Sequence, residues 1–284
     1  MTAFTLHNDA GVDSGTYDRI SRLLARAAPL AERHSRLSLP DRASVRIVST
    51  EQFVSLTADH GEYTMRQAAD AFPAGSGSRD RALAEVQACR DGFERAAAQS
   101  WPMVTAAVVC RSTAGDPEMI TMPEGHAESR ATDRYLTGAF AHEWTHLAQN
   151  KVWPAMPYAH IRIALQADAD GLPPEQRRTT HHVIEGHAQW VQRQTVQELC
   201  GVATAQLRLD GEPKPTKRFR RLKTQSPLIS IYDQGDAFIS ALHDTGGHPL
   251  IERLLRNEDL LPTLGEITNP TTWLERYAPA MSGA

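Results

Sequence analysis

Two histidines and a glutamate stand together in the segment His142-Glu143-Trp144-Thr145-His146. Residues four apart in a helix lie on the same face, so both imidazoles can reach one metal ion. Glu143 lies at the flank of that face, where its carboxylate can reach a water on the metal rather than the metal itself. The residue types and their spacing therefore predict a Zn²⁺ site that activates water for hydrolysis.

A helix over residues 131–150 would present these groups on one of two distinct faces. The histidine face also carries the small residues Gly138 and Ala139, which leave room for an ion and a substrate, and Tyr135. The opposite face is apolar and is expected to pack against the core through Leu136, Phe140, Trp144 and Leu147.

The third ligand is expected from Glu185, which borders the apolar arc of a helix predicted over residues 174–199. An unpaired carboxylate entering a core costs free energy, whereas a carboxylate bound to Zn²⁺ is compensated. Gly186 next to it permits close approach of another helix or of substrate. The alternative is a glutamate at the edge of a solvated face, paired with Arg193. A catalytic zinc site has three protein ligands and one open position, and Glu185 would complete that set.

The motifs His-Glu-Trp-Thr-His-Leu-Ala-Gln and, at residues 185–190, Glu-Gly-His-Ala-Gln-Trp resemble the gluzincin clan of zinc metallopeptidases. The likeness is greatest to its small members, whose second motif is Glu-Gly-x-Ala-x-Tyr/Trp, and it spans residues 118–255. It implies that His142, His146 and Glu185 bind zinc and that Glu143 is the general base. It also implies a zincin-like α+β fold, in which a mixed sheet with a substrate-binding edge strand and the active-site helix precede an all-helical subdomain. Residues 118–122 occupy the place of that edge strand.

Further side chains are expected near the metal. Tyr232 begins a segment similar to the Tyr-x-x-Gly-x-x-Phe helix of the small members. The resemblance implies that its phenol donates a hydrogen bond to the oxyanion of the tetrahedral intermediate. The alternative is that Tyr232 is a tyrosine of the hydrophobic core. His181 lies one turn before Glu185 and is a transition-state donor, a substitute ligand or a support for a ligand. In better-known gluzincins an aspartate at the position of Gln189 accepts a hydrogen bond from a zinc histidine and so orients it. Here that acceptor is the side-chain carbonyl of Gln189 or a group elsewhere in the chain. His187 points away from Glu185 on the helical wheel.

The elements that must position these residues follow from periodicity and turn signals. Strands are predicted over residues 43–49, 104–111 and 118–122; the second is apolar on both faces and so central, and the third is short, ends at Pro123 and so lies at an edge. The remaining helices are predicted over residues 15–37, 51–59, 79–98 with Ser78 as cap, 159–166, 228–243 and 250–257. Residues 1–150 would form an α/β subdomain ending in the histidine helix, and residues 151–284 a helical subdomain carrying Glu185.

Composition limits the classes of function. The 284 residues are 41% hydrophobic and carry a formal net charge of −4, which indicates neither a nucleic-acid nor a membrane partner. No signal peptide and no membrane-spanning run is visible, and three sparse cysteines suit a reducing compartment, so a cytoplasmic location is expected.

Peptide bonds are the expected target, and the substrate is a peptide or a small amide. One alternative keeps the zinc but acts on a small or modified amide or ester, and another is a non-catalytic scaffold that binds a partner. The basic run at residues 214–223 favours a solvated loop over nucleic-acid binding, and it could also line the cleft and favour acidic substrates. The oligomeric state is left open by the sequence.

Overall fold

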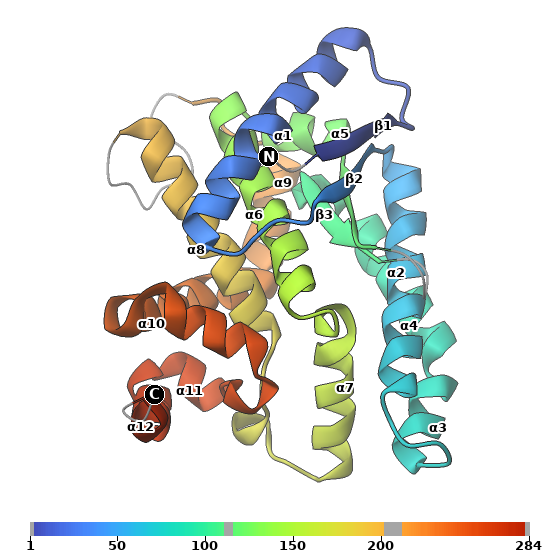
Figure 1. Cartoon of the computed structure of the whole chain (residues 1–284). Coiled ribbons are helices and arrows are strands. Elements are labelled where there is room, and N and C mark those ends of the chain that lie inside the picture. Colours follow the sequence, from blue (N-terminus) through green and yellow to red (C-terminus); the bar gives the residue numbers. More distant parts are fainter. Residues whose placement is uncertain (1–2, 111–115, 202–211, 282–284) are drawn as a thin grey trace.

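The computed structural model describes residues 3–110, 116–201 and 212–281. A small sheet and a larger set of helices make an α+β fold, in which α2, α3 and α4 lie on one side of α7 and α10 to α12 on the other (Figure 1). The strands are β1 (Ala3–Asn8), β2 (Arg42–Ile47), β3 (Ala106–Val109) and β4 (Glu118–Thr121). The helices are α1 (Ser14–Ser35), α2 (Thr50–Asp70), α3 (Gly77–Ala84), α4 (Val86–Ser100), α5 (Pro123–Ser129), α6 (Asp133–Val152), α7 (Met156–Ala169), α8 (His181–Cys200), α9 (Lys217–Gln225), α10 (Leu228–Arg256), α11 (Leu264–Thr268) and α12 (Pro270–Met281), with short 3₁₀ turns at Trp101–Met103, Pro174–Gln176 and Glu258–Leu260.

The sheet has the strand order β1-β2-β4-β3, with β1, β2 and β4 parallel and β3 antiparallel to β4. The prediction for the last two strands was therefore wrong: β4 lies inside the sheet and β3 is at its edge. The apolar character of β3 comes from its contacts with α2 and α6, which cover its faces and do not require a strand on each side. The first strand, β1, was missed although Phe4 and Leu6 alternate with exposed residues there.

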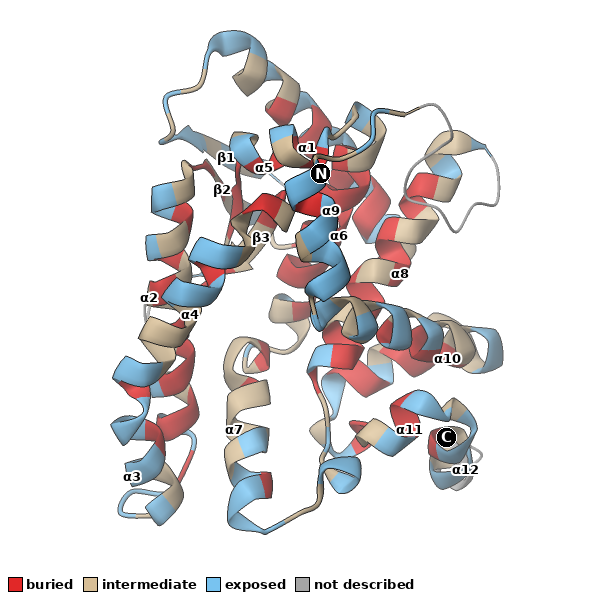
Figure 2. Ribbon diagram, turned by 180° about the vertical axis from the view of Figure 1, so that it is seen from behind, coloured by how far each residue is buried: buried red, intermediate tan, exposed pale blue. Residues whose placement is uncertain are grey.

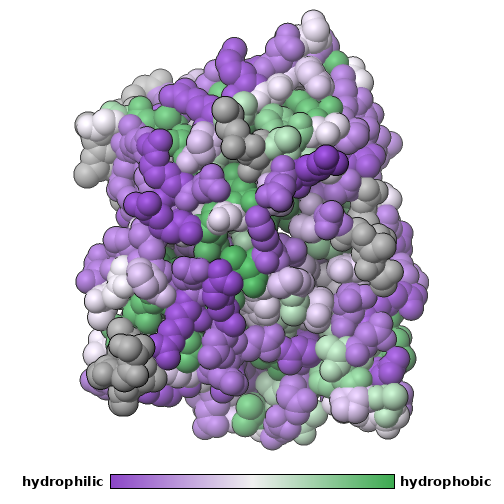
Figure 3. All heavy atoms as spheres, in the orientation of Figure 1, coloured by the Kyte–Doolittle hydropathy of each residue, from purple (hydrophilic) through white to green (hydrophobic). Residues whose placement is uncertain are grey.

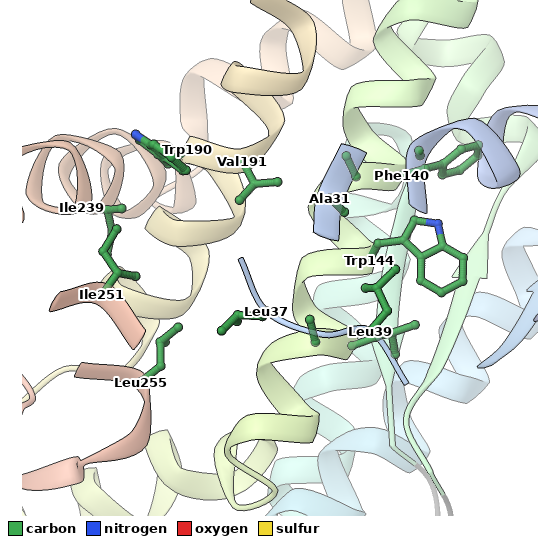
Figure 4. Close-up of a cluster of buried hydrophobic side chains, with 14 of the residues drawn as sticks. Ala31, Leu37, Leu39, Phe140, Trp144, Trp190, Val191, Ile239, Ile251 and Leu255 are labelled. Atoms are coloured by element: carbon green, nitrogen blue, oxygen red, sulfur yellow. The ribbon is translucent and has the colours of Figure 1, made fainter. Parts of the chain in front are cut away.

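The helix that carries the two histidines is α6, and its predicted apolar face is confirmed. The four residues of that face are each at most 1% exposed. Gly138 does not leave room for a substrate as predicted; it lets α8 approach, because a Cβ there would lie 2.8 Å from Cγ2 of Val196. The indole N–H of Trp144 donates to the Leu24 carbonyl at 3.2 Å, which fixes α6 against α1. Residues of α1, α6, α8 and α10 meet in one hydrophobic cluster (Figure 4). Buried residues concentrate around this cluster, whereas α7 is mostly exposed or intermediate (Figure 2). The cluster draws on residues before and after position 150, and the two-subdomain division stays a prediction.

Several helix boundaries differ from the prediction because local signals compete. The second helix continues to Asp70 because Met65, Ala68 and Ala69 extend its buried stripe. The stretch 79–98 is two helices that meet at Glu85, and its cap is Ser76, whose side chain accepts from the Arg79 amide.

Two further helices downstream also have other boundaries than expected. Residues 174–176 form only a 3₁₀ turn, and α8 starts at His181. The helices expected at 228–243 and 250–257 are one element, α10, which is kinked at Gly247 with φ 64° and ψ −162°. Only glycine adopts this conformation readily, so the predicted break persists as a kink.

Helices α8 and α10 cross in close contact at Gly186 and Gly235. A Cβ atom added at Gly186 would lie 2.2 Å from the Gly235 carbonyl carbon, which is far closer than van der Waals contact. Gly186 therefore serves the approach of a helix, the first of the two roles expected for it, and the crossing sets the position of Glu185 on α8.

We expect Gly186→Ala to destabilise the fold by about 1–3 kcal/mol, because the backbone of α10 must move away from the new methyl group. Gly92→Ala in α4 is the matched control, since its Cβ would meet nothing within 4 Å. Relief from glycine's backbone entropy should make that control neutral or more stable by about 0.5–1 kcal/mol. Urea unfolding followed by circular dichroism measures both changes, and an unaltered midpoint for Gly186→Ala would contradict the crossing.

The surface offers no sign of a membrane segment within the described ranges. No helix there combines the length and the apolar composition that crossing a bilayer requires. The face drawn in Figure 3 is covered mainly by hydrophilic side chains, with apolar residues showing in small groups. The cytoplasmic location stays a prediction.

Candidate metal centre

Helices α6 and α8 bring the three predicted ligand residues to one point. Nε2 of His142 and Nε2 of His146 are 3.0 Å apart. Oε2 of Glu185 lies 3.3 Å from the first nitrogen and 3.5 Å from the second. In the part of the chain that the structure describes, this is the one group of three such side chains whose ligand atoms converge.

The separations of these three atoms suit a tetrahedral zinc ion. Zinc binds imidazole nitrogen and carboxylate oxygen at about 2.0–2.1 Å, which places neighbouring ligand atoms of a tetrahedron roughly 3.3–3.4 Å apart. The observed edges of 3.0, 3.3 and 3.5 Å bracket that value. The donor set of two imidazoles and one carboxylate leaves a fourth position open, as in catalytic zinc sites.

The charges at the centre are strongly coupled. Burial alone would lower the pKa of His146, but the Glu185 carboxylate raises that pKa to about 9. Burial would raise the pKa of Glu185, but the two histidines hold it well below its ordinary value. Arg193, the alternative partner for Glu185, instead pairs with Asp236 at 3.0 Å, so the solvated-face interpretation is wrong. Glu185 is thus held as a carboxylate facing two imidazole nitrogens.

Glu143 is only 8% exposed and lies beside the three converging atoms. Its carboxylate lines two cavities that both reach the centre. Burial is the main cause that raises the pKa of Glu143. A raised pKa brings a carboxylate towards the range in which it accepts and returns protons near neutral pH.

Gln149 orients His146, a role that the sequence analysis did not assign. Its side-chain carbonyl accepts from Nδ1 of His146 at 2.9 Å, and its amide donates to the Ile184 carbonyl at 3.0 Å. The same amide lies 3.1 Å from Nδ1 of His187, which serves as its second acceptor. With Nδ1 of His146 protonated, Nε2 is left with a free lone pair that points at the centre. The available signal was the position of Gln149, three residues after His146 on the same helix.

Gln189 does not orient a zinc histidine in this arrangement. Its side chain lines the smaller of the two cavities. Nδ1 of His142 is buried and has no hydrogen-bond partner among the described residues. The orienting acceptor therefore comes from elsewhere, and Gln149 supplies it for one histidine of the pair.

We expect Gln149→Leu to weaken zinc binding by about 10- to 100-fold, because removing the group that fixes a ligand's tautomer and ring orientation has that order of effect. The leucine also leaves the Ile184 carbonyl and His187 without their donor. Gln192→Leu is the matched control, as Gln192 is a buried glutamine of α8 that is 6% exposed. Competition of each variant with a zinc-binding dye measures the dissociation constant. Equal constants for the two variants would show that Gln149 does not support the site.

Tyr232 and His181 both lie at the centre's cavities but differ in their surroundings. The Tyr232 ring centroid is 6.0 Å from that of His142, and Tyr232 lines both cavities. The Glu185 carboxylate, with burial and Glu143, raises the pKa of Tyr232 well above its ordinary value, so its phenol keeps its proton. His181 lines only the larger cavity, where it stacks on His160 with ring centroids 4.5 Å apart. Of the two candidate donors, Tyr232 therefore lies at both cavities and next to His142.

The two cavities meet at Glu143, which lines both of them. The larger has a volume of about 250 Å³ and the smaller about 200 Å³. Both are lined by Val104, Ala106, His142, Glu143 and Tyr232. They are therefore two halves of one depression, which is lined by the edge strand β3 and by the residues with converging ligand atoms.

No protein-family model matches the sequence of this chain, and no curated protein matches it. Its fold is similar to a crystal structure of a candidate hydrolase with a novel fold from Chloroflexus aurantiacus. That superposition has a TM-score of 0.57 at 16% identity, and it covers 95% of this chain and 93% of the other. At this identity the likeness concerns the fold alone, and the zincin-like fold implied by the resemblance stays a prediction.

Proposed function

We propose that the protein is a zinc-dependent hydrolase that cleaves peptide bonds. The observation that carries the proposal is the convergence of His142, His146 and Glu185 within the edge lengths of a tetrahedral zinc site, with Glu143 beside them. The likeness in fold to a candidate hydrolase supports hydrolysis in general. The resemblance of the two motifs to gluzincins supports a peptidase.

The side chains divide the chemistry between them. A bound zinc ion supplies a Lewis acid for the carbonyl and lowers the pKa of bound water to about 7. Glu143 accepts the proton of the attacking water and returns it to the leaving nitrogen. Tyr232 donates its phenol hydrogen to the oxygen that becomes negative. His146 is held by Gln149 with its Nε2 lone pair towards the centre.

A peptide is favoured over a small amide or ester by the shape of the site. The two cavities share Glu143 and otherwise have mostly different linings, so a chain that runs from one cavity into the other can place its scissile bond at Glu143. The edge strand β3 contributes Ala106, Ala107 and Val108 to the larger cavity, and the unpaired side of an edge strand can bind an extended backbone.

A panel of quenched fluorescent peptides and small amides tests the substrate class. We expect the zinc-loaded protein to cleave peptides that extend to both sides of the scissile bond, with kcat/KM falling as either side is shortened. Cleavage of single-residue amides at the same kcat/KM would support the small-substrate alternative. No hydrolysis of any substrate by zinc-loaded protein would support the scaffold.

A further inference from the structure

The basic run at residues 214–223 forms a helix beside the site instead of the predicted solvated loop. It contains six basic residues, and its helical part is α9. The side chain of Thr216 caps α9 by accepting a hydrogen bond from the Phe219 amide. The Phe219 side chain is buried, with 5% of the residue exposed, and anchors the helix. Arg218 lies over the Trp101 ring, with 4.6 Å from Cζ to the ring centroid. These contacts hold the helix at a fixed place on the protein.

The other basic side chains of α9, those of Lys217, Arg220, Arg221 and Lys223, are exposed. Within the described ranges no ion pair joins them to an acidic side chain, although most other arginines there are paired. In a chain of net charge −4, α9 is a local concentration of positive charge, and the Glu128 carboxylate is an acidic group that contacts its capping residue, Thr216. Such a concentration attracts anions.

Lys223 connects this charge to the catalytic depression. It lines the smaller cavity together with Phe219, from the same helix, and with Glu143. Arg220 precedes Lys223 by one helical turn and so continues the same face outwards. The other ionisable residues that line this cavity are His142, Glu143 and Tyr232 at the centre, and Tyr135. Lys223 is therefore the basic residue of the lining outside the centre.

The larger cavity has a different character. It contains neither lysine nor arginine, and its carboxylates are Glu143 and Glu185 of the centre. The rest of its lining is mostly apolar and includes Asn150, His60, His160 and His181. Burial lowers the pKa of His60 to about 4 and that of His160 to about 3, so both are neutral at pH 7. This half of the depression suits an uncharged side chain.

We infer that the substrate is an acidic peptide, with carboxylates on the side of the scissile bond that occupies the smaller cavity and an uncharged residue on the other side. The inference rests on the proposed peptidase function and adds its substrate class. Acidic side chains beyond the scissile bond would meet Lys223 first and then Arg220 along α9. A nucleic acid would also meet positive charge there, but Lys223 lines the cavity that Glu143 also lines, which favours a ligand that reaches Glu143.

Binding to the Glu143→Gln variant tests the substrate class apart from turnover. Three types of peptide of equal length, labelled with an uncharged dye, carry acidic, neutral or basic residues on one side of an apolar residue and uncharged residues on the other, each type in both chain directions. We expect the acidic peptide to bind about tenfold or more tightly than the neutral one at low salt, and the advantage to shrink in 0.5 M NaCl, because exposed charges are screened. Equal affinity for the three peptides would overturn the inference.

Charge reversal on α9 locates the effect. Arg220→Glu/Lys223→Glu should remove the preference for the acidic peptide, while Lys223→Gln, which perturbs the fold less, should reduce it several-fold. The matched control is Arg26→Glu/Arg81→Glu on α1 and α3, which makes the same change in net charge at exposed sites outside both cavities. An unchanged preference in the α9 variants, or an equal loss in the control, would contradict the inference.

Two further readouts separate the possible failures. Zinc content and cleavage of the neutral peptide by the wild-type chain test the proposed function alone. If the wild-type chain binds no zinc and cleaves no peptide, the proposed function fails; if it does both but shows no preference for the acidic peptide, only the inferred substrate class fails. A single-stranded oligonucleotide of equal charge is the competitor. Tighter binding of the oligonucleotide than of the acidic peptide, removed by the α9 charge reversal, would replace the acidic-peptide site with a nucleic-acid surface.

Discussion

Replacing Glu143 by glutamine should abolish peptide hydrolysis while leaving zinc bound. The amide keeps the size of the side chain but cannot accept a proton from water, and a positioned general base contributes about 10²- to 10⁴-fold to the rate. The three predicted ligands are untouched by the change, so the zinc content of the variant should equal that of the wild-type chain. Activity is measured on a fluorescent peptide and zinc by elemental analysis of the same sample.

Glu124→Gln is the control for this substitution. Glu124 is an exposed glutamate of α5 that borders neither cavity. It should keep both full activity and full zinc content. Unchanged turnover in Glu143→Gln would reject Glu143 as the base, and loss of zinc from that variant would instead make Glu143 part of the metal site.

Removing the Tyr232 hydroxyl should lower kcat by about 10²- to 10³-fold with little change in KM, because a donor to the developing oxyanion acts mainly in the transition state. Tyr232→Phe keeps the ring beside His142 and removes only the donor. Because the raised pKa of Tyr232 keeps the phenol protonated throughout the neutral range, the variant's relative loss should be constant between about pH 6 and 9. Steady-state kinetics across that range measure it.

Two rival donors serve as controls for Tyr232. Tyr135 lines the smaller cavity and has a phenol of the same kind, while His181 lines the larger cavity. Tyr135→Phe and His181→Gln should each cost far less in kcat than Tyr232→Phe. A larger loss in His181→Gln would transfer the donor role to that imidazole, which was the other candidate from the sequence.

The convergence of His142, His146 and Glu185 could be predicted because the direction of each side chain is set by the helix that carries it. The spacing of His142 and His146 determines their common direction in any helix, and the apolar stripe of α6 leaves little choice about which face is buried. Glu185 was found in the same way, from its place at the border of the apolar arc of α8. These features are local, so a single sequence contains them.

The features that were missed depend on tertiary packing. The position of β3 at the sheet edge depends on which strand is its neighbour, and its apolar residues would suit either place. Gln149 could be given its role only when the Ile184 carbonyl and His187 came within reach of its amide. For Gly186, the close approach itself was expected, but that it serves a helix and not a substrate was decided by Gly235 on another helix. In each case the deciding partner lies on a separate element of the chain.

The most direct measurement is the zinc content of the purified chain and of its ligand variants after dialysis against zinc and then buffer. We expect about one zinc per wild-type chain, the stoichiometry of a three-ligand site, and little or none in His146→Ala and Glu185→Ala. Circular dichroism confirms that the variants are folded. A wild-type chain that retains no zinc, or a Glu185→Ala variant that retains all of it, would contradict a zinc ion held between α6 and α8.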